Sequence, residues 1–174
     1  LVDALSEKAE AYKNVPTMAF THIQPAEITT IGYRLSQTLQ DLLDDREQLV
    51  FVKKNIRGKG MKGAVGTAAS YKELVAESSV SSIALENMVM EELGIKAYDA
   101  ATQIYSRKQD LRIIEALSSI ACTLHKFSLD FRILQSPPIG EFSEPFGKMQ
   151  VGSSAMPFKR NPINSEKIDS PSRI

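Results

Sequence analysis

The sequence contains no tryptophan, a single cysteine and two histidines, and this scarcity excludes several kinds of site. One cysteine cannot form a disulfide framework or a cysteine metal cluster within the chain. Cys122 lies in the apolar pattern SSIACTLHKF, where we expect a small buried side chain. His22 and His125 show neither an HxxxH spacing nor an Asp/His pair, so we predict no metal site and assign no cofactor.

The chain also lacks a net charge and a long apolar run. Its 21 basic and 21 acidic side chains cancel, which removes any net-charge argument for binding nucleic acid or an anionic membrane. No stretch approaches the about 20 consecutive apolar residues of a membrane span, and the start LVDALSEKAE does not resemble a signal peptide. We therefore expect a cytoplasmic protein, without nucleic-acid or membrane partners, in which any anion site is local.

Apolar residues recur at steps of three and four along three long stretches, a spacing that predicts amphipathic helices. Gly94 is placed to end the second helix, and Ser136-Pro137-Pro138 to end the third. No run shows strand alternation between turn signals, so the predicted fold class is all-α, a bundle of long helices. The long helices are expected over residues 27–55, 71–93 and 108–134, with shorter helical pieces over 2–13 and from 161 onward.

The length of these helices has a consequence for assembly. A helix of about 25 to 30 residues is ~40 Å long and needs partners of similar length. The three predicted helices have more apolar faces than one small bundle can cover, which predicts self-association.

The histidines and acids allow structural as well as functional interpretations. His22 follows Thr21 at the entrance to the first long helix, where it could transfer protons near neutral pH or serve as a capping or surface histidine. His125, in the middle of a helix, is expected to be structural. The acids of the first long helix are expected to form a solvated face, and they are Asp41, Asp44, Asp45 and Glu47.

Two glycine-containing runs could bind anions. RGKGMKGAVGT, which starts at Arg57, is either an anion site or a turn with solvated lysines, and it does not fit a Walker loop. The run VGSSAMPFKRNP offers backbone N–H groups and hydroxyls, while Lys159 and Asn161 could stabilise developing negative charge. The chain lacks the order of a Ser/His/Asp triad, so a Ser153 that accepts a proton must be ionised by its surroundings, and a reaction other than acyl transfer is implied.

The run GSSAMPFKRNP resembles the GSSxMPxKxNP signature of the fumarase/aspartase superfamily, whose members cleave C–N or C–O bonds by β-elimination and release fumarate. Together with FTHIQPAEITTIG, RGKGMKGAVGTAAS and QIYSRK, it is similar to the adenylosuccinate lyase family from Leu1 to about Ile168. Argininosuccinate lyase shares an element like THIQPAE and the GSS loop, but YSRK and KRNP fit it less well.

The resemblance implies an activity and a set of site residues. The expected reaction is release of fumarate from adenylosuccinate, giving AMP, and from aminoimidazole carboxamide succinyl ribotide (SAICAR), giving AICAR, in purine biosynthesis. Motif matching implies that Ser153 is the general base and His22 the general acid. The implied substrate-binding residues are Thr21, Gln103, Lys159 and Asn161.

The resemblance also implies an assembly. Residues 1–174 match the central helical-bundle domain of a longer enzyme, without the family's N-terminal and C-terminal domains, so we expect the fragment alone to be inactive. The family is homotetrameric and builds each active site from several chains, which implies that His22 and Ser153 of one chain serve different sites. An alternative of a different class is a non-catalytic helical assembly domain.

Overall fold

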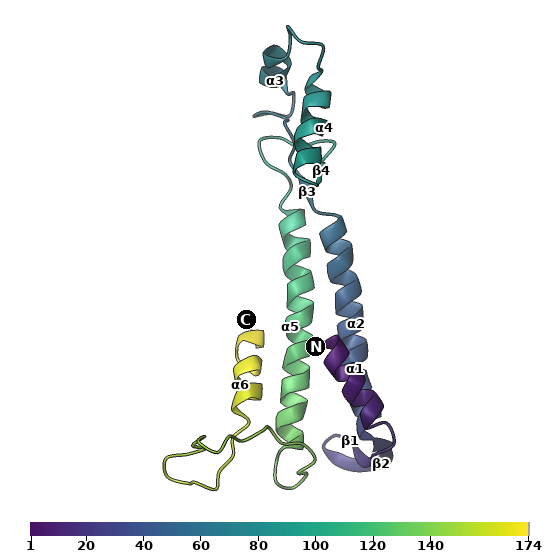
Figure 1. Cartoon of the computed structure of the whole chain (residues 1–174), viewed down its shortest axis with the longest axis vertical. Coiled ribbons are helices and arrows are strands. Elements are labelled where there is room, and N and C mark those ends of the chain that lie inside the picture. Colours follow the sequence, from purple (N-terminus) through teal and green to yellow (C-terminus); the bar gives the residue numbers. More distant parts are fainter. Residues whose placement is uncertain (174) are drawn as a thin grey trace. The chain divides into compact units, whose positions relative to one another are not determined.

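A computed structural model describes residues 1–173 (Figure 1). Helices dominate it, and the strands form two small two-stranded sheets, so the predicted all-α class is confirmed. In chain order the elements are α1 (Val2–Ala11), β1 (Pro16–Thr21), β2 (Gln24–Thr30), α2 (Ile31–Lys54), β3 (Arg57–Gly58), α3 (Ala69–Leu74), α4 (Ser82–Glu92), β4 (Lys96–Ala97), α5 (Lys108–Leu134), α6 (Ile163–Asp169) and a 3-10 turn, η1 (Pro171–Arg173).

The chain divides into two compact units. The first comprises Leu1–Glu47 and Leu117–Ile174, and it includes α1, the hairpin β1–β2 and α6. The second comprises Gln48–Ala116 and includes α3, α4 and the parallel pair β3–β4. The helices α2 and α5 contribute residues to both.

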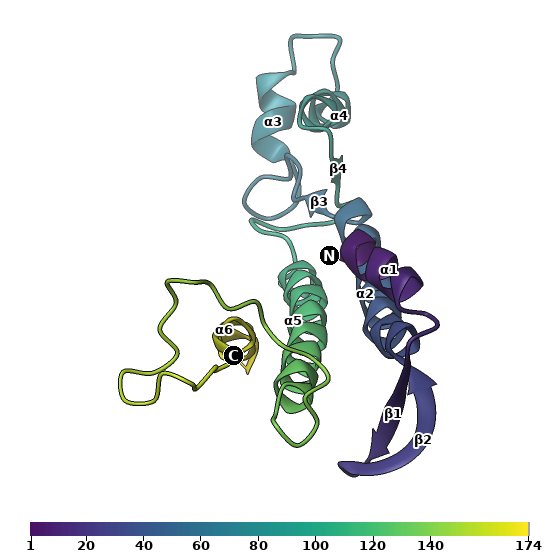
Figure 2. The ribbon, with the colours of Figure 1, turned by 60° about the horizontal axis from the view of Figure 1, so that its bottom comes forward.

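The predicted start of the first long helix is wrong. Helix α2 begins at Ile31, because the preceding residues form the antiparallel hairpin β1–β2 (Figure 2). In this hairpin Thr21 faces Gln24. Pro25 lacks an N–H and disfavours helix at the residue before it, while a hairpin edge tolerates proline. The threonines of both strands also favour extended backbone. His22 therefore lies in a hairpin turn and not at a helix entrance.

The predicted helix 71–93 is interrupted between α3 and α4. The Ser78 hydroxyl donates to the Val75 carbonyl at 2.9 Å, and Ser81 caps α4 by accepting from the Ala84 N–H at 3.1 Å. Serine side chains that bond to nearby backbone compete with helix and favour its ends. The expected stop is confirmed, because α4 ends at Glu92 and Gly94 has a φ of +67°. Helix α5 begins and ends where we predicted.

The acids on α2 are not all solvated, because Asp45 is buried. Its carboxylate accepts hydrogen bonds from the Ser119 hydroxyl at 2.5 Å and the Thr123 hydroxyl at 2.7 Å, both on α5. The expectation of a solvated face fails at this position, since helical spacing does not show which hydroxyls the partner helix presents. Asp44 and Glu47 are exposed as expected.

One side of α5 carries apolar side chains that the described chain leaves exposed. Leu111, Ile114 and Leu117 are 53%, 62% and 54% exposed. Cys122, three helical turns after Leu111, is exposed as well, which contradicts our expectation of a buried side chain. Its surroundings are apolar in sequence, but no element of residues 1–173 covers it.

Candidate active site

The turn of the hairpin holds His22 in an unusual backbone conformation. His22 and Ile23 have φ values of 52° and 61°, and both are exposed. Such two-residue turns prefer Asn-Gly, and a β-branched residue at positive φ is a steric outlier. Backbone strain of this kind concentrates at functional sites, so it singles out the turn and the neighbouring Thr21 for attention.

The base of the hairpin is fixed to the bundle by Glu141. This carboxylate accepts from the Thr17 hydroxyl at 2.7 Å and from Arg34 Nη1 at 2.5 Å. Arg34 also donates to the Met18 carbonyl. The side chains of Arg34 and Glu141 are 17% and 10% exposed, so this ion pair is largely removed from solvent.

A groove of about 480 Å³ runs beneath the hairpin, within the first unit. Partial burial raises the pKa of Asp130 at its edge, against the opposing effects of Lys126 and Arg34. Most of the remaining lining is apolar and includes Phe20, Ile23, Ile28, Phe127, Phe131 and Phe142.

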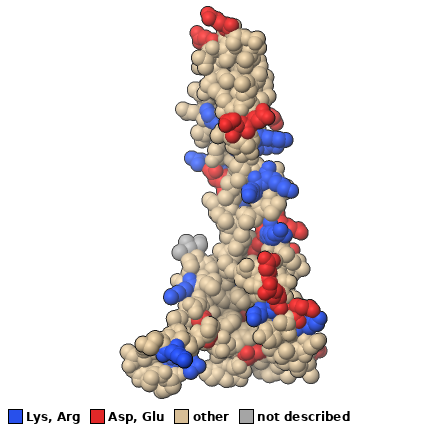
Figure 3. Space-filling model, viewed as in Figure 1, with Lys and Arg blue, Asp and Glu red and all other residues tan. Residues whose placement is uncertain are grey.

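The serine loop, residues 145–162, is the later part of the connection between α5 and α6 and contains the GSSAMPFKRNP run. It has three cationic residues, Lys148, Lys159 and Arg160, and no acidic one. Figure 3 shows positive side chains on this loop at the lower left. The loop therefore presents a local positive charge on a chain whose total charge is zero.

The loop folds back on itself around Gly152. A Cβ at this position would overlap the Lys159 carbonyl oxygen and lie 3.2 Å from the Phe146 ring. Arg160 lies over the same ring, 5.1 Å from its centre. Glycine is needed here because the two backbone segments approach too closely for a side chain.

Ser153 follows that close approach and is half-buried. Its oxygen accepts from the N–H groups of Met156 at 3.2 Å and Ala155 at 3.4 Å. Donors of this kind stabilise negative charge on the oxygen. Lys159 is exposed and Asn161 half-buried.

Gln103 lies elsewhere, in the second unit, where it is exposed in the segment before α5. Nearby, Asp110 accepts from Arg107 Nη1 and from the Tyr105 hydroxyl, both at 3.0 Å. These bonds, that from Arg107 first, lower the pKa of Asp110, and the bond to Asp110 raises the pKa of Tyr105. The QIYSRK segment is thus tied to the first turn of α5.

The glycine-rich run is held by Glu86, a buried residue of α4. Its carboxylate accepts from the Met61 N–H at 2.7 Å and from Lys62 Nζ at 2.5 Å. Gly60, at a φ of +71°, has no room for a Cβ beside this carboxylate. Because Lys62 is already paired, the geometry favours the turn over the anion site at this residue. Its side chain is only 15% exposed, so the expectation of a solvated lysine is wrong here.

The two predicted proton-transfer residues stand apart in the first unit. Thr21 and His22 belong to the hairpin, and Ser153, Lys159 and Asn161 to the serine loop. Within residues 1–173, no hydrogen bond or ion pair joins a side chain of one group to the other. The same described residues contain no group of three or more His, Cys, Asp or Glu side chains suited to a metal ion, and no helix able to cross a membrane.

Comparison with known proteins gives the same family as the GSSAMPFKRNP run. The family model described as Lyase matches residues 1–173. The chain belongs to this lyase family. It is 43% identical to the adenylosuccinate lyase of Schistosoma mansoni and 40% identical to that of Saccharomyces cerevisiae, over 99% of the chain in each case. It is 39% identical to that of Pyrococcus horikoshii over 98%. It spans 36% of the length of each relative.

Solved structures share the fold of this chain. The 3-carboxy-cis,cis-muconate lactonizing enzyme of Pseudomonas putida superimposes with a TM-score of 0.81 at 24% identity, over 99% of the chain and 37% of that structure. A fumarate lyase:delta crystallin of Brucella melitensis gives 0.79 at 24% identity, with the same coverage. These likenesses confirm the helical fold expected from the sequence.

Sequence reasoning missed the residues that support the hairpin and the serine loop. Glu141 anchors the hairpin, and Glu144 and Gln135 bind both ends of the serine loop. The only local sign of Glu144 in the sequence was its place next to a proline, in SEPF. Its carboxylate's partners lie some 20 or more residues away, and no local spacing connects them to it.

Proposed function

We propose that the protein containing this chain is an adenylosuccinate lyase that releases fumarate from adenylosuccinate and from SAICAR. The observation that carries the proposal is the 43% identity to an adenylosuccinate lyase over 99% of the chain, with the GSSAMPFKRNP run intact. The cationic serine loop supports it, because both substrates carry carboxylates and a phosphate.

In the proposed reaction, Ser153 removes a proton from the carbon beside a succinyl carboxylate. The C–N bond then breaks as the C=C bond of fumarate forms, and His22 protonates the leaving nitrogen. The N–H groups of Ala155 and Met156 support the first role because they stabilise charge on the Ser153 oxygen. Lys159 and Asn161 would hold the carboxylate dianion that forms, while Thr21 and Gln103 would bind substrate.

The proposal includes assembly of the intact protein into a cytoplasmic homotetramer acting in purine biosynthesis, with His22 and Ser153 of one chain serving different sites. The exposed apolar side of α5, including Leu117 and Cys122, supports self-association. In the assembled protein, Cys122 should react with a thiol reagent only after denaturation. Rapid reaction of the native protein, or sedimentation as a monomer, would contradict this part of the proposal.

The activity is tested by following fumarate release from adenylosuccinate, and separately from argininosuccinate, with the longest protein that contains the chain. Ser153→Ala should lower kcat by about 10²-fold or more, as expected for loss of a general base. Ser154→Ala, a change at the adjacent exposed serine, is the matched control. A Ser153→Ala enzyme within about twofold of wild type would refute the base assignment. Turnover of argininosuccinate alone would refute the proposal that adenylosuccinate is the substrate. Inactivity on both compounds would favour a non-catalytic assembly domain.

A further inference from the structure

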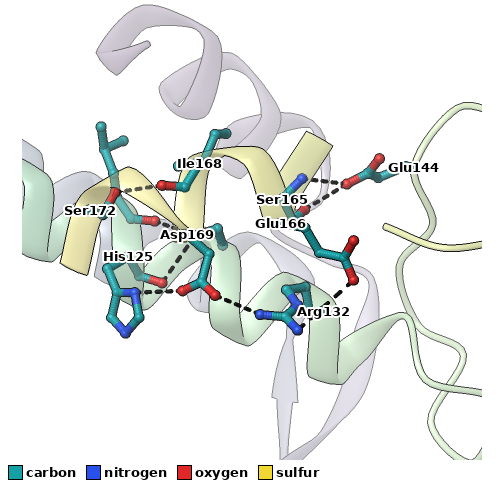
Figure 4. Close-up of polar contacts among 10 residues, drawn as sticks. His125, Arg132, Glu144, Ser165, Glu166, Ile168, Asp169 and Ser172 are labelled. Carbon is teal, nitrogen blue, oxygen red and sulfur yellow. Dashed lines mark hydrogen bonds and ion pairs between the residues drawn. The ribbon is translucent and has the colours of Figure 1, made fainter. Parts of the chain in front are cut away.

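A carboxylate outside the proposed chemistry joins the two ends of the serine loop. Glu144 stands immediately before the loop, and Asn164 and Ser165 stand just after it. Glu144 Oε2 accepts from the Asn164 N–H at 3.0 Å. Oε1 accepts from both the N–H and the hydroxyl of Ser165 at 2.7 Å (Figure 4). We call these three hydrogen bonds the stem clasp.

Gln135, at the end of α5, binds the same two ends. Its side-chain oxygen accepts from the Glu144 N–H at 2.8 Å, and its amide nitrogen donates to the Arg160 carbonyl at 3.1 Å. Helix α6 is in turn held on α5 by the Asp169 carboxylate, which is paired with Arg132 (Figure 4). The stem clasp therefore fastens the loop to a support that is itself fixed.

We propose that Glu144 is a positioning residue for Ser153, acting by closing the stem of the serine loop. The inference rests on the proposed role of Ser153 as the general base. A loop with joined ends has fewer conformations to lose when it orders. Position matters because a shift of about 1 Å in a reacting group can cost about 10²-fold in rate.

The chemistry of the clasp suits a carboxylate better than an amide. Both Glu144 oxygens accept, and all three partners donate. A glutamine would turn an NH₂ group toward an N–H donor, so Glu144→Gln should lose at least one of the bonds while keeping the shape. Glu144→Ala should lose all three.

The experiment uses the full-length protein with two readouts, fumarate release and hydrogen exchange of the amides in 145–165. For Glu144→Ala we expect kcat to fall about 10-fold to 100-fold, with a smaller change in KM, because Ser153 acts after substrate has bound. The amides of Asn164 and Ser165 should exchange faster than in wild type. Glu144→Gln should lie between, and Glu7→Gln, a change of an exposed carboxylate on α1, should alter neither readout.

The outcomes separate this inference from the proposed function. Wild-type exchange and a kcat within twofold of wild type in a folded Glu144→Ala protein would overturn the inference and leave the function standing. An inactive wild-type protein would overturn the proposed function. In that case hydrogen exchange still tests the stem clasp, and amide exchange in Glu144→Ala equal to that of wild type would overturn it. If Glu144→Ala does not fold, both measurements are made on Glu144→Gln. A Glu144→Gln protein with the same kcat and the same hydrogen exchange as wild type would overturn the inference.

Discussion

Arg132 on α5 and Asp169 on α6 form an ion pair, with 2.6 Å between Nη1 and Oδ2, although 37 residues separate them in sequence. The other oxygen of Asp169 lies 2.5 Å from His125 Nδ1. Helix α6 lies beside α5 in both ribbon views and directly follows the serine loop (Figures 1 and 2). These contacts therefore fix the point at which the loop returns to the bundle.

Changing Asp169 to asparagine should destabilise the protein, because it removes the charge while keeping the shape. The Asp169 side chain is 4% exposed and that of Arg132 is 31% exposed, so Arg132 loses a partially desolvated partner. We expect the free energy of unfolding to fall by about 1.5–3 kcal/mol, the range for a hydrogen bond to a charged group. Chemical denaturation at fixed protein concentration measures it.

The matched control for this change is Asp41→Asn. Asp41 pairs with Lys126 at 3.1 Å, but both side chains are substantially exposed, so about 0–1 kcal/mol is expected. Equal losses in the two variants would contradict the anchoring role of Asp169.

Gly152→Ala should disable the serine loop while leaving the bundle intact. The added methyl group would overlap the Lys159 carbonyl oxygen, so residues 152 and 159 must separate and Ser153 must shift. For the proposed release of fumarate by the full-length protein, we expect kcat/KM to fall by about 10²-fold, with unchanged helical circular dichroism. Gly147→Ala is the control in the same loop, since its Cβ would meet its nearest neighbours at an ordinary 3.9 Å. Equal activities of the two variants would show that the close approach at Gly152 is unimportant.

Local pattern predicted the helices well wherever one face of a helix decides its conformation. Helix α5 has regular apolar spacing and a proline stop, and both of its ends were predicted correctly. The hairpin was missed because β2 is mostly exposed and shows no alternation of burial, while β1 alternates only between exposed and half-buried positions over four residues. The break after α3 was missed because serine capping outweighs an apolar spacing that continues through it.

The candidate site likewise contains residues that a local motif predicts and residues that only distant contacts define. The residues expected to do the chemistry could be named because they lie in a specific run and beside His22, and their roles stay predictions. The supporting residues could not be named, since Glu144 and Glu141 are defined by partners from 20 to 124 positions away. Asp45 shows the same limit within the bundle. A row of acids on α2 predicts solvent exposure, and only the position of the α5 hydroxyls shows that Asp45 is an acceptor between the helices.

Asp45→Ala should cost stability through the polar groups that it leaves behind. The buried Thr123 hydroxyl would lose its acceptor at a site where Asp45 is 5% exposed, whereas the exposed Ser119 can bond to water instead. An unsatisfied buried polar group costs about 1–3 kcal/mol, so a drop of at least that size in the free energy of unfolding is expected. Asp44→Ala, one position earlier and exposed, should change it by less than about 0.5 kcal/mol. Indistinguishable variants would show that the buried carboxylate contributes no net stability.

The stem clasp should also make the protein sensitive to acid. Burial tends to raise the pKa of Glu144, but the hydrogen bonds from Ser165 and Asn164 together outweigh it and lower the pKa below its ordinary value of 4.5. A carboxylate with a lowered folded-state pKa contributes stability that is present above 4.5 and is lost as pH falls through the lower folded value. The melting temperature of wild type should therefore exceed that of Glu144→Gln at pH 6 to 7, and the gap should close on acidification below 4.5. Glu7→Gln should show no such pH dependence. A gap that stays constant with pH, or widens in acid, would mean that the ionised form of Glu144 is not what holds the two ends of the loop together.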